Sequence, residues 1–131
     1  MIVIPQALIA QMGEQAVAGY PYEVCGLMIG AGDRVERYVP CTNVAASARV
    51  YTIDPKEHLK AELSAEKDGL EVIGVVHSHT HSEAYPSPTD VAQAPDPGWH
   101  YVIVSLKSGQ PAPRSYRIVN GEIAEEEIVN S

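Results

Sequence analysis

The run Glu71–His77 constrains the fold of this chain more than any other segment. Its body, Val72–Val76, consists mainly of β-branched apolar residues, a composition typical of a strand that is buried on both faces. The run ends in His77, and Ser78-His79 follow directly. We therefore expect a central buried strand, with polar chemistry concentrated where that strand ends.

The rest of the chain alternates between helical and strand patterns. Pro5 can occupy the first position of a helix that continues to about Ala18, and Asp54-Pro55 starts a second helix that continues to about Lys67. Further strands are expected over residues 2–4, 25–29, 35–39, 101–106, 114–119 and 122–129. With 131 residues and a 45% hydrophobic composition, the chain can fill one core. We expect a single α/β domain over residues 1–131, with a mixed β-sheet and flanking helices.

Charge and cysteine content exclude several classes of protein. The 9 Lys and Arg against 17 Asp and Glu give a formal charge of −8, and the basic residues are scattered, whereas binding of nucleic acid normally needs a basic stripe. No stretch is apolar enough to span a membrane, and none has the form of a signal peptide. The two cysteines, Cys25 and Cys41, are too few for a disulfide scaffold, which favours a cytoplasmic protein.

The acidic stretch Glu122–Glu127 is interpreted as a solvated strand face, and His100 as an ordinary surface or packing residue.

His77 and His79 have the spacing of two metal ligands. On a strand they project to the same face roughly 6.6 Å apart, and their rings can lean together toward one ion. Two histidines alone make a weak site, so a third ligand must come from elsewhere, and Asp90 is well placed because the loop 82–86 folds back. Three protein ligands leave a fourth tetrahedral position for water, which is typical of catalytic zinc.

Asp90 belongs to a short helix that begins after that loop. Ser87 is expected at the N-cap, Pro88 at the first helical position and Asp90 at the third, which is close to a capping box. This local geometry predicts that the carboxylate of Asp90 has a fixed direction.

Glu23 is the candidate proton carrier. It lies between the first helix and the strand over 25–29, where the small residue Gly26 allows another element to come close. A carboxylate beside a zinc ion would accept the proton of the attacking water at neutral pH. Sequence order alone does not place Glu23 beside the histidines.

These residues resemble the JAMM, or MPN-plus, metalloprotease motif: Glu, then His-Ser-His, seven residues, Ser, two residues, Asp. Every fixed position of that motif is present, as Glu23, His77, His79, Ser87 and Asp90. The similarity extends to Pro21–Leu27 and to the general order of elements, and so covers about residues 1 to 120.

The resemblance implies the JAMM/MPN fold, which is cytidine deaminase-like. It implies that His77, His79 and Asp90 ligate Zn²⁺, and that Glu23 acts as general base and then as general acid. It also implies that Ser87 helps to hold the oxyanion, a role that competes or combines with its role as a helix cap.

Members of this family cut the bond after the Gly-Gly tail of ubiquitin or a ubiquitin-like protein. The stretch from His77 through Thr80, followed by Glu83–Ser87, is similar to the branch that removes cysteine from the C-terminus of a sulfur-carrier protein in cysteine biosynthesis. That reaction is the predicted one, and the runner-up is an isopeptidase that removes a ubiquitin-like modifier from protein lysines. We expect the loops 41–51 and 81–86 to wall a groove for the tail, beside an open sheet edge. The oligomeric state stays open, a homo-oligomer included.

Several alternatives compete with these assignments. A non-catalytic MPN scaffold typically loses ligands that this chain keeps, and a zinc deaminase would show a Pro-Cys-x-x-Cys pair that is absent. His81 extends the pattern to His-Ser-His-Thr-His, but we interpret it as a loop residue rather than a ligand. Cys25 is interpreted as a small buried hydrophobe.

Overall fold

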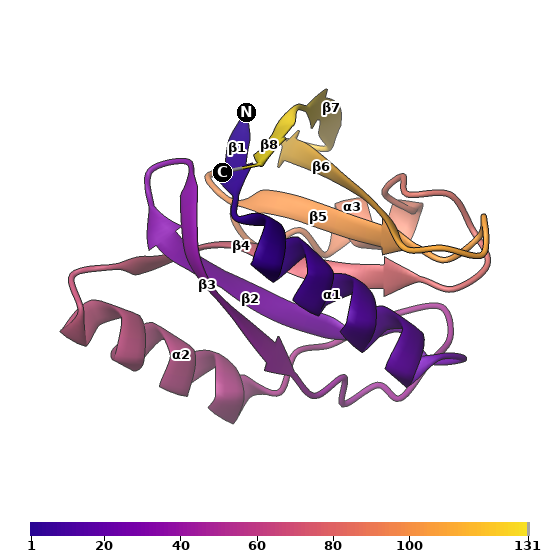
Figure 1. Ribbon diagram of the computed structural model, residues 1–131, viewed down its shortest axis with the longest axis horizontal. Coiled ribbons are helices and arrows are strands. Elements are labelled where there is room, and N and C mark those ends of the chain that lie inside the picture. Colours follow the sequence, from indigo (N-terminus) through magenta and orange to yellow (C-terminus); the bar gives the residue numbers. More distant parts are fainter. Residues whose placement is uncertain (131) are drawn as a thin grey trace.

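The computed structural model describes residues 1–130, and its centre is one eight-stranded mixed sheet (Figure 1). The strands are β1 (Ile2–Ile4), β2 (Cys25–Ala31), β3 (Arg34–Cys41), β4 (Glu71–His79), β5 (His100–Ser105), β6 (Ala112–Val119), β7 (Glu122–Glu126) and β8 (Ile128–Asn130). The helices of the described residues are α1 (Gln6–Gly19), α2 (Pro55–Lys67) and α3 (Pro88–Ala92). The predicted α/β architecture, a mixed sheet with flanking helices, is confirmed. None of these helices is long and apolar enough to cross a membrane.

The strand predicted to be central is central. The spatial order is β7-β6-β5-β4-β2-β3-β1-β8, and β4 runs antiparallel to β2 and parallel to β5. β4 extends beyond the predicted end at His77, because β5 continues to pair with it as far as the register pair His79 and Ser105. Both candidate histidines therefore lie within β4, where His77 has a register partner on each side and His79 has one on β5.

Two apolar cores lie on opposite faces of this sheet. Leu27 on β2 belongs to one core and its neighbour Met28 to the other, as the alternation of a strand requires. Helix α2 covers the first face through Ala65, and α1 covers the opposite face through Met12. Figure 1 shows α1 lying across its face of the sheet.

The helix starts follow the sequence closely. Asp54 caps α2, because its Oδ1 accepts a hydrogen bond from the backbone N–H of Lys56 at 2.8 Å, and Pro55 takes the first helical position. Pro5 differs from the prediction, since it stands at the N-cap position before Gln6. Its ψ of 139° keeps the extended backbone of β1, so α1 begins one residue later than expected.

The single strand predicted over 122–129 is wrong. β7 ends at Glu126 and pairs with β6, whereas β8 pairs with β1 at the other edge of the sheet. Only Glu127 separates β7 from β8, so the sheet must curl until its two edges approach each other (Figure 1).

This break also corrects the expectation that the acidic stretch Glu122–Glu127 is a solvated face. Glu126 is turned inward, and its Oε2 lies 2.6 Å from His100 Nδ1 and accepts a hydrogen bond from Ser115 Oγ at 2.8 Å. The acidic stretch is therefore not wholly a solvated face. His100 is buried, with its Nε2 3.1 Å from Oδ1 of Asp33 in the β2–β3 turn.

Candidate metal centre

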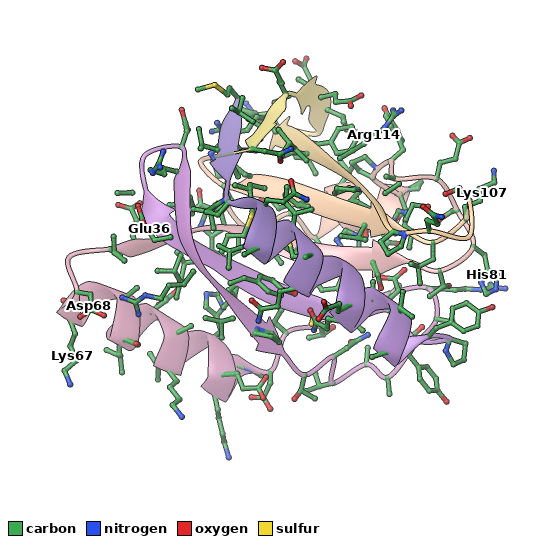
Figure 2. All side chains as sticks on the ribbon, viewed as in Figure 1. Glu36, Lys67, Asp68, His81, Lys107 and Arg114 are labelled. Carbon is green, nitrogen blue, oxygen red and sulfur yellow. The ribbon has the colours of Figure 1, made fainter. Side chains whose placement is uncertain are left out.

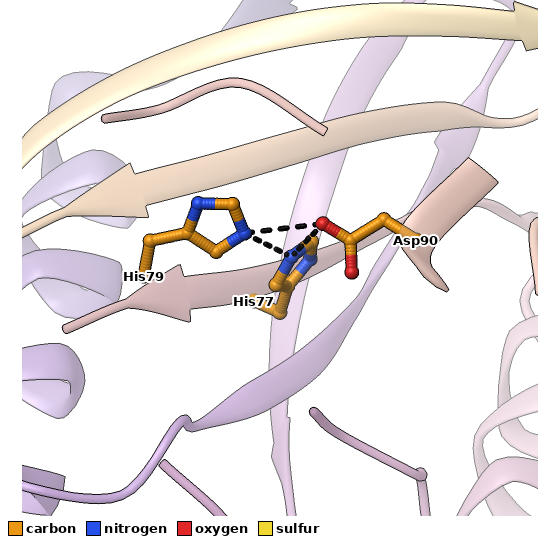
Figure 3. Close-up of side chains that lie close together, drawn as sticks. All are labelled: His77, His79 and Asp90. Atoms are coloured by element: carbon orange, nitrogen blue, oxygen red, sulfur yellow. Dashed lines mark hydrogen bonds and ion pairs between the residues drawn. The ribbon is translucent and has the colours of Figure 1, made fainter. Parts of the chain in front are cut away.

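Three side chains meet at the carboxyl end of β4 (Figure 3). His77 and His79 come from the strand and Asp90 from the first turn of α3. Asp90 Oδ2 lies 3.2 Å from His77 Nε2 and 3.1 Å from His79 Nε2, and the two Nε2 atoms are 3.2 Å apart. Among residues 1–130, this is the one group of three or more His, Cys, Asp or Glu side chains arranged to hold a metal.

The alternation of β4 explains why these side chains meet. His77 and His79 follow Val75 on the same face, and Val75 belongs to the core that α2 covers. Val91 of α3 packs against that same core, which brings the first turn of α3 over the strand end. Tyr51 stacks on the ring of His77 with 4.3 Å between ring centroids and so fixes its orientation.

Asp90 is held by the predicted capping box. Ser87 N donates to Asp90 Oδ2 at 2.9 Å, and Asp90 N donates to Ser87 Oγ at 3.0 Å. Pro88 occupies the first turn, as expected. The same Oδ2 atom faces both histidines, so the cap of α3 aims the carboxylate into the cluster.

The hydrogen-bonding roles of these atoms fit a shared cation. The backbone carbonyl of Glu83 can only accept, so His79 Nδ1, 2.8 Å away, must donate to it. In the neutral ring His79 Nε2 then carries a bare lone pair, which faces the carboxylate of Asp90 at 3.1 Å. One proton can be shared by only two of the three atoms His77 Nε2, His79 Nε2 and Asp90 Oδ2. A metal ion can bind all three at once. Two imidazoles and one carboxylate are a suitable donor set for a divalent transition metal.

The electrostatics of the cluster keep His77 and Asp90 in the protonation states that can bind a metal. Burial lowers the pKa of His77 and so favours its neutral imidazole. Burial raises the pKa of Asp90, but hydrogen bonds with both histidines outweigh it and hold that pKa well below the usual range. For His79, burial lowers the pKa, yet contacts with Asp90 and the Glu83 carbonyl outweigh burial and raise it. A metal must therefore compete with a proton for His79 as the pH falls.

Glu23 is brought to the cluster by backbone contacts with β4 and with the loop after β3. Ser78, between the two histidines, accepts from Val24 N at 2.9 Å and donates its own N–H to Val24 O at 3.0 Å. Glu23 N donates to Ser47 O at 2.8 Å, and its carbonyl accepts from Asn43 Nδ2 at 3.0 Å. These four hydrogen bonds position Glu23 independently of its side chain.

The side chain of Glu23 is buried and partly unsatisfied. Its Oε1 has no hydrogen-bond partner among the described residues. Burial raises the pKa of Glu23 to about 7, although nearby His79 lowers it. A carboxylate with a pKa near neutrality is suited to accept and return a proton.

Glu23, His79 and Ser87 line one cavity of about 530 Å³. Ala48 and Arg49 from one predicted wall, and His81 and Ser82 from the other, complete the lining together with Thr80. The walls are therefore as expected, but the cavity does not lie beside an open sheet edge. It lies where β2 stops pairing with the interior strand β4.

Neither His81 nor Cys25 belongs to the three-ligand group. His81 lies outside the three-ligand group, at the surface of the molecule (Figure 2), with Nε2 2.9 Å from Tyr20 Oη. Cys25 is fully buried, and burial raises the pKa of its thiol to about 12, which makes it unreactive. It is the register partner of both Cys41 and His77.

Sequence reasoning missed Ser78, Asn43 and Arg49. Ser78 is the fixed middle residue of the His-Ser-His motif, and that position was the available signal. Asn43 and Arg49 lie in the loop that was predicted to wall the groove, but the sequence did not single them out, because Asn43 reaches Glu23 and Arg49 reaches the cavity through tertiary contacts alone.

Comparisons with known proteins show the family of this chain. The model of the family described as prokaryotic homologs of the JAB domain matches residues 5–119. The chain is 40% identical over 131 residues to the CysO-cysteine peptidase of Mycobacterium tuberculosis, an alignment that covers 98% of this chain and 90% of the relative. It is 37% identical over 102 residues to the desampylase of Haloferax volcanii, covering 76% of this chain and 73% of the relative.

A solved structure has the same fold. The solution structure of a protein from Desulfitobacterium hafniense superposes with a TM-score of 0.89 at 34% sequence identity, covering all of this chain and 93% of the other.

Proposed function

Because this chain belongs to the family of prokaryotic homologs of the JAB domain, we propose that it is a zinc-dependent peptidase that hydrolyses the amide bond after the Gly-Gly tail of a ubiquitin-like sulfur-carrier protein. The released product would be free cysteine, formed as a step of cysteine biosynthesis. The observation that carries this proposal is the triangle of His77, His79 and Asp90 with Glu23 in the adjoining cavity. The two cores share one sheet, which supports the proposal that residues 1–131 form a single catalytic domain.

The dimensions of the triangle suit zinc. Ligand atoms that bind one tetrahedral zinc ion at about 2.0–2.1 Å lie about 3.3–3.4 Å from one another. The observed separations of 3.1 to 3.2 Å are close to this spacing. When bound there, zinc supplies a Lewis acid that polarises a carbonyl and makes water more acidic.

Glu23 and Ser87 supply the remaining chemistry. Hydrolysis consumes one water, whose oxygen ends in the new glycine carboxylate, while the C–N bond breaks and the amine leaves. Glu23 takes a proton from that water and passes it to the departing nitrogen. Ser87 Oγ accepts from Asp90 N, so its hydroxyl hydrogen remains available to the carbonyl oxygen as negative charge develops there.

A second candidate function has its own support. The desampylase relative favours an isopeptidase that removes a ubiquitin-like modifier from protein lysines. The scaffold alternative is weaker, because the chain keeps every ligand and Glu23 in one cluster.

One experiment separates these functions. The zinc-loaded protein is incubated with a sulfur-carrier protein that ends in Gly-Gly-Cys, and with the same carrier joined to a lysine by an isopeptide bond. Mass spectrometry should detect free cysteine and the carrier ending in Gly-Gly. Cleavage of the isopeptide alone would favour the second function, and cleavage of neither by the metal-loaded protein would reject both.

A further inference from the structure

Arg49 is a cationic side chain in the cavity that holds Glu23, His79 and Ser87. No Lys and no other Arg lines that cavity. Arg49 makes no ion pair with any carboxylate of residues 1–130, and its side chain is exposed. The chain as a whole has a formal charge of −8, which repels anions, whereas the positive charge of Arg49 attracts an anionic group to this cavity.

The backbone around Arg49 is fixed by the catalytic elements. Ser47 O accepts from Glu23 N at 2.8 Å, and Ala48 O accepts from Thr80 Oγ1 at 3.3 Å. The hydroxyl of Ser47 accepts from Arg49 N at 3.0 Å. These contacts hold Arg49 at the cavity mouth, beside the general base and the strand that carries the metal ligands.

The two candidate substrates differ in charge next to the bond that is cut. In a C-terminal amino acid adduct, the carbon attached to the departing nitrogen also bears a free α-carboxylate. In a lysine isopeptide, that nitrogen is followed by four methylene groups, and no carboxylate is near. A planar guanidinium is well suited to bind a carboxylate through two parallel hydrogen bonds.

We propose that Arg49 is a specificity-determining residue that binds the free α-carboxylate of the amino acid being released. This inference rests on the proposed peptidase function and refines it: the site prefers a tail that ends in one free amino acid. Arg49 moves no proton, and its contribution is to bind and orient the departing residue. It also offsets the repulsion that acidic Glu23 and Asp90 would exert on an anionic substrate.

The test compares two matched carrier proteins, one ending in Gly-Gly-Cys with a free carboxylate and one ending in Gly-Gly-cysteinamide. The original protein should favour the free acid in kcat/KM by about 10- to 100-fold, the range of a hydrogen bond to a charged group. Arg49→Gln should reduce this ratio to about one, and Arg49→Lys should keep part of it. Arg34→Gln is the matched control, because Arg34 pairs with Glu36 at the opposite end of the molecule from His81 (Figure 2).

Two results would overturn the role of Arg49 while the peptidase function stands. One is equal cleavage of the acid and the amide by the original protein, and the other is an Arg49→Gln variant that loses both activities in the same proportion. Thermal unfolding of the variants checks that the substitutions have not destabilised the fold. If neither carrier is cleaved, the proposed function fails. Calorimetric binding of the two tail peptides to Glu23→Gln then tests Arg49 separately, and equal Kd values would reject it.

Discussion

Ser87 and Asp90 exchange two hydrogen bonds, and the same Asp90 oxygen that accepts from Ser87 N also faces His77 and His79. The cap of α3 and the proposed third metal ligand are therefore one group. Folding of this helix turn sets the direction of the carboxylate before a metal arrives, which reduces the ordering needed on binding.

This double role predicts that two substitutions of Asp90 will differ. Asp90→Asn keeps an oxygen that can accept from Ser87 N but removes the charge, so zinc content should fall, and the metal-free protein should lose the stability that the ionised carboxylate gains from His77 and His79. Asp90→Ala removes both the accepting oxygen and the charge, and the lost cap should cost up to about 1 kcal/mol more in the free energy of unfolding. Elemental analysis and thermal unfolding measure the two effects. Full zinc occupancy in Asp90→Ala would remove Asp90 from the ligand set.

Ser87 should affect both rate and stability. Ser87→Ala removes the acceptor for Asp90 N and the hydroxyl that faces the cavity, so we expect about 1 kcal/mol of lost stability and a kcat lowered by about 10²- to 10³-fold. Ser87→Thr retains the hydroxyl and should recover most of both. If Ser87→Ala lowers the melting temperature but leaves kcat as it was, Ser87 is a helix cap alone.

Glu23 should be needed for turnover but not for metal binding. Glu23→Gln keeps the size of the side chain and removes the base, so turnover should drop by at least about 100-fold with zinc still bound. Glu14→Gln, on the exposed face of α1, is the matched control. Loss of zinc from Glu23→Gln would indicate that Glu23 is a ligand, and near-normal turnover would place the base elsewhere.

We expect the cavity to select the carrier tail because its two glycines have no side chains. Residues 48–49 and 81–82 wall the cavity beside Glu23, and a side chain on the tail would have to fit between these walls next to the bond that is cut. Replacing the penultimate glycine of the carrier tail by leucine should lower kcat/KM by about 10- to 200-fold, the range in which a pocket rejects added apolar groups. A substitution on the carrier far from its tail serves as comparison. Equal rates for the two tails would reject this tail recognition while leaving the hydrolase itself intact.

Glu126 should make the fold sensitive to acid. Burial raises its pKa, but hydrogen bonds from His100, Ser115 and the Met1 ammonium outweigh burial and hold the pKa at about 2, below the ordinary 4.5. Between these values the unfolded chain binds more protons, so the free energy of unfolding falls as the pH falls from about 4.5 to about 2.

Glu126→Gln removes this titration, so the metal-free variant should be less stable than the original protein at pH 7 by at most about 3 kcal/mol. The gap should close toward pH 2, as measured by thermal unfolding of both proteins across that range. A gap of constant size at every pH would mean that the ionisation of Glu126 does not contribute.

The sequence by itself determined those parts of the site whose geometry is local. The two-residue period of a strand puts His77 and His79 on one face, and the capping box of Ser87 and Asp90 involves residues three apart. The apolar composition of residues 72–76 predicted a central strand, because a strand that is apolar on both faces must be covered on both. Each of these features depends on backbone geometry over a few residues, and the pattern of side chains reports it directly.

Only the tertiary structure decided what lies beside that strand. Glu23 reaches the metal site because β2 pairs with β4 and because Ser78 and Ser47 hold its backbone, and Arg49 reaches it through the loop tied to Thr80. The inward turn of Glu126 likewise depends on the pairing of β8 with β1 across the curled sheet. These contacts join residues that are far apart along the chain, and their partners are chosen by packing and sheet order, which no local periodicity encodes.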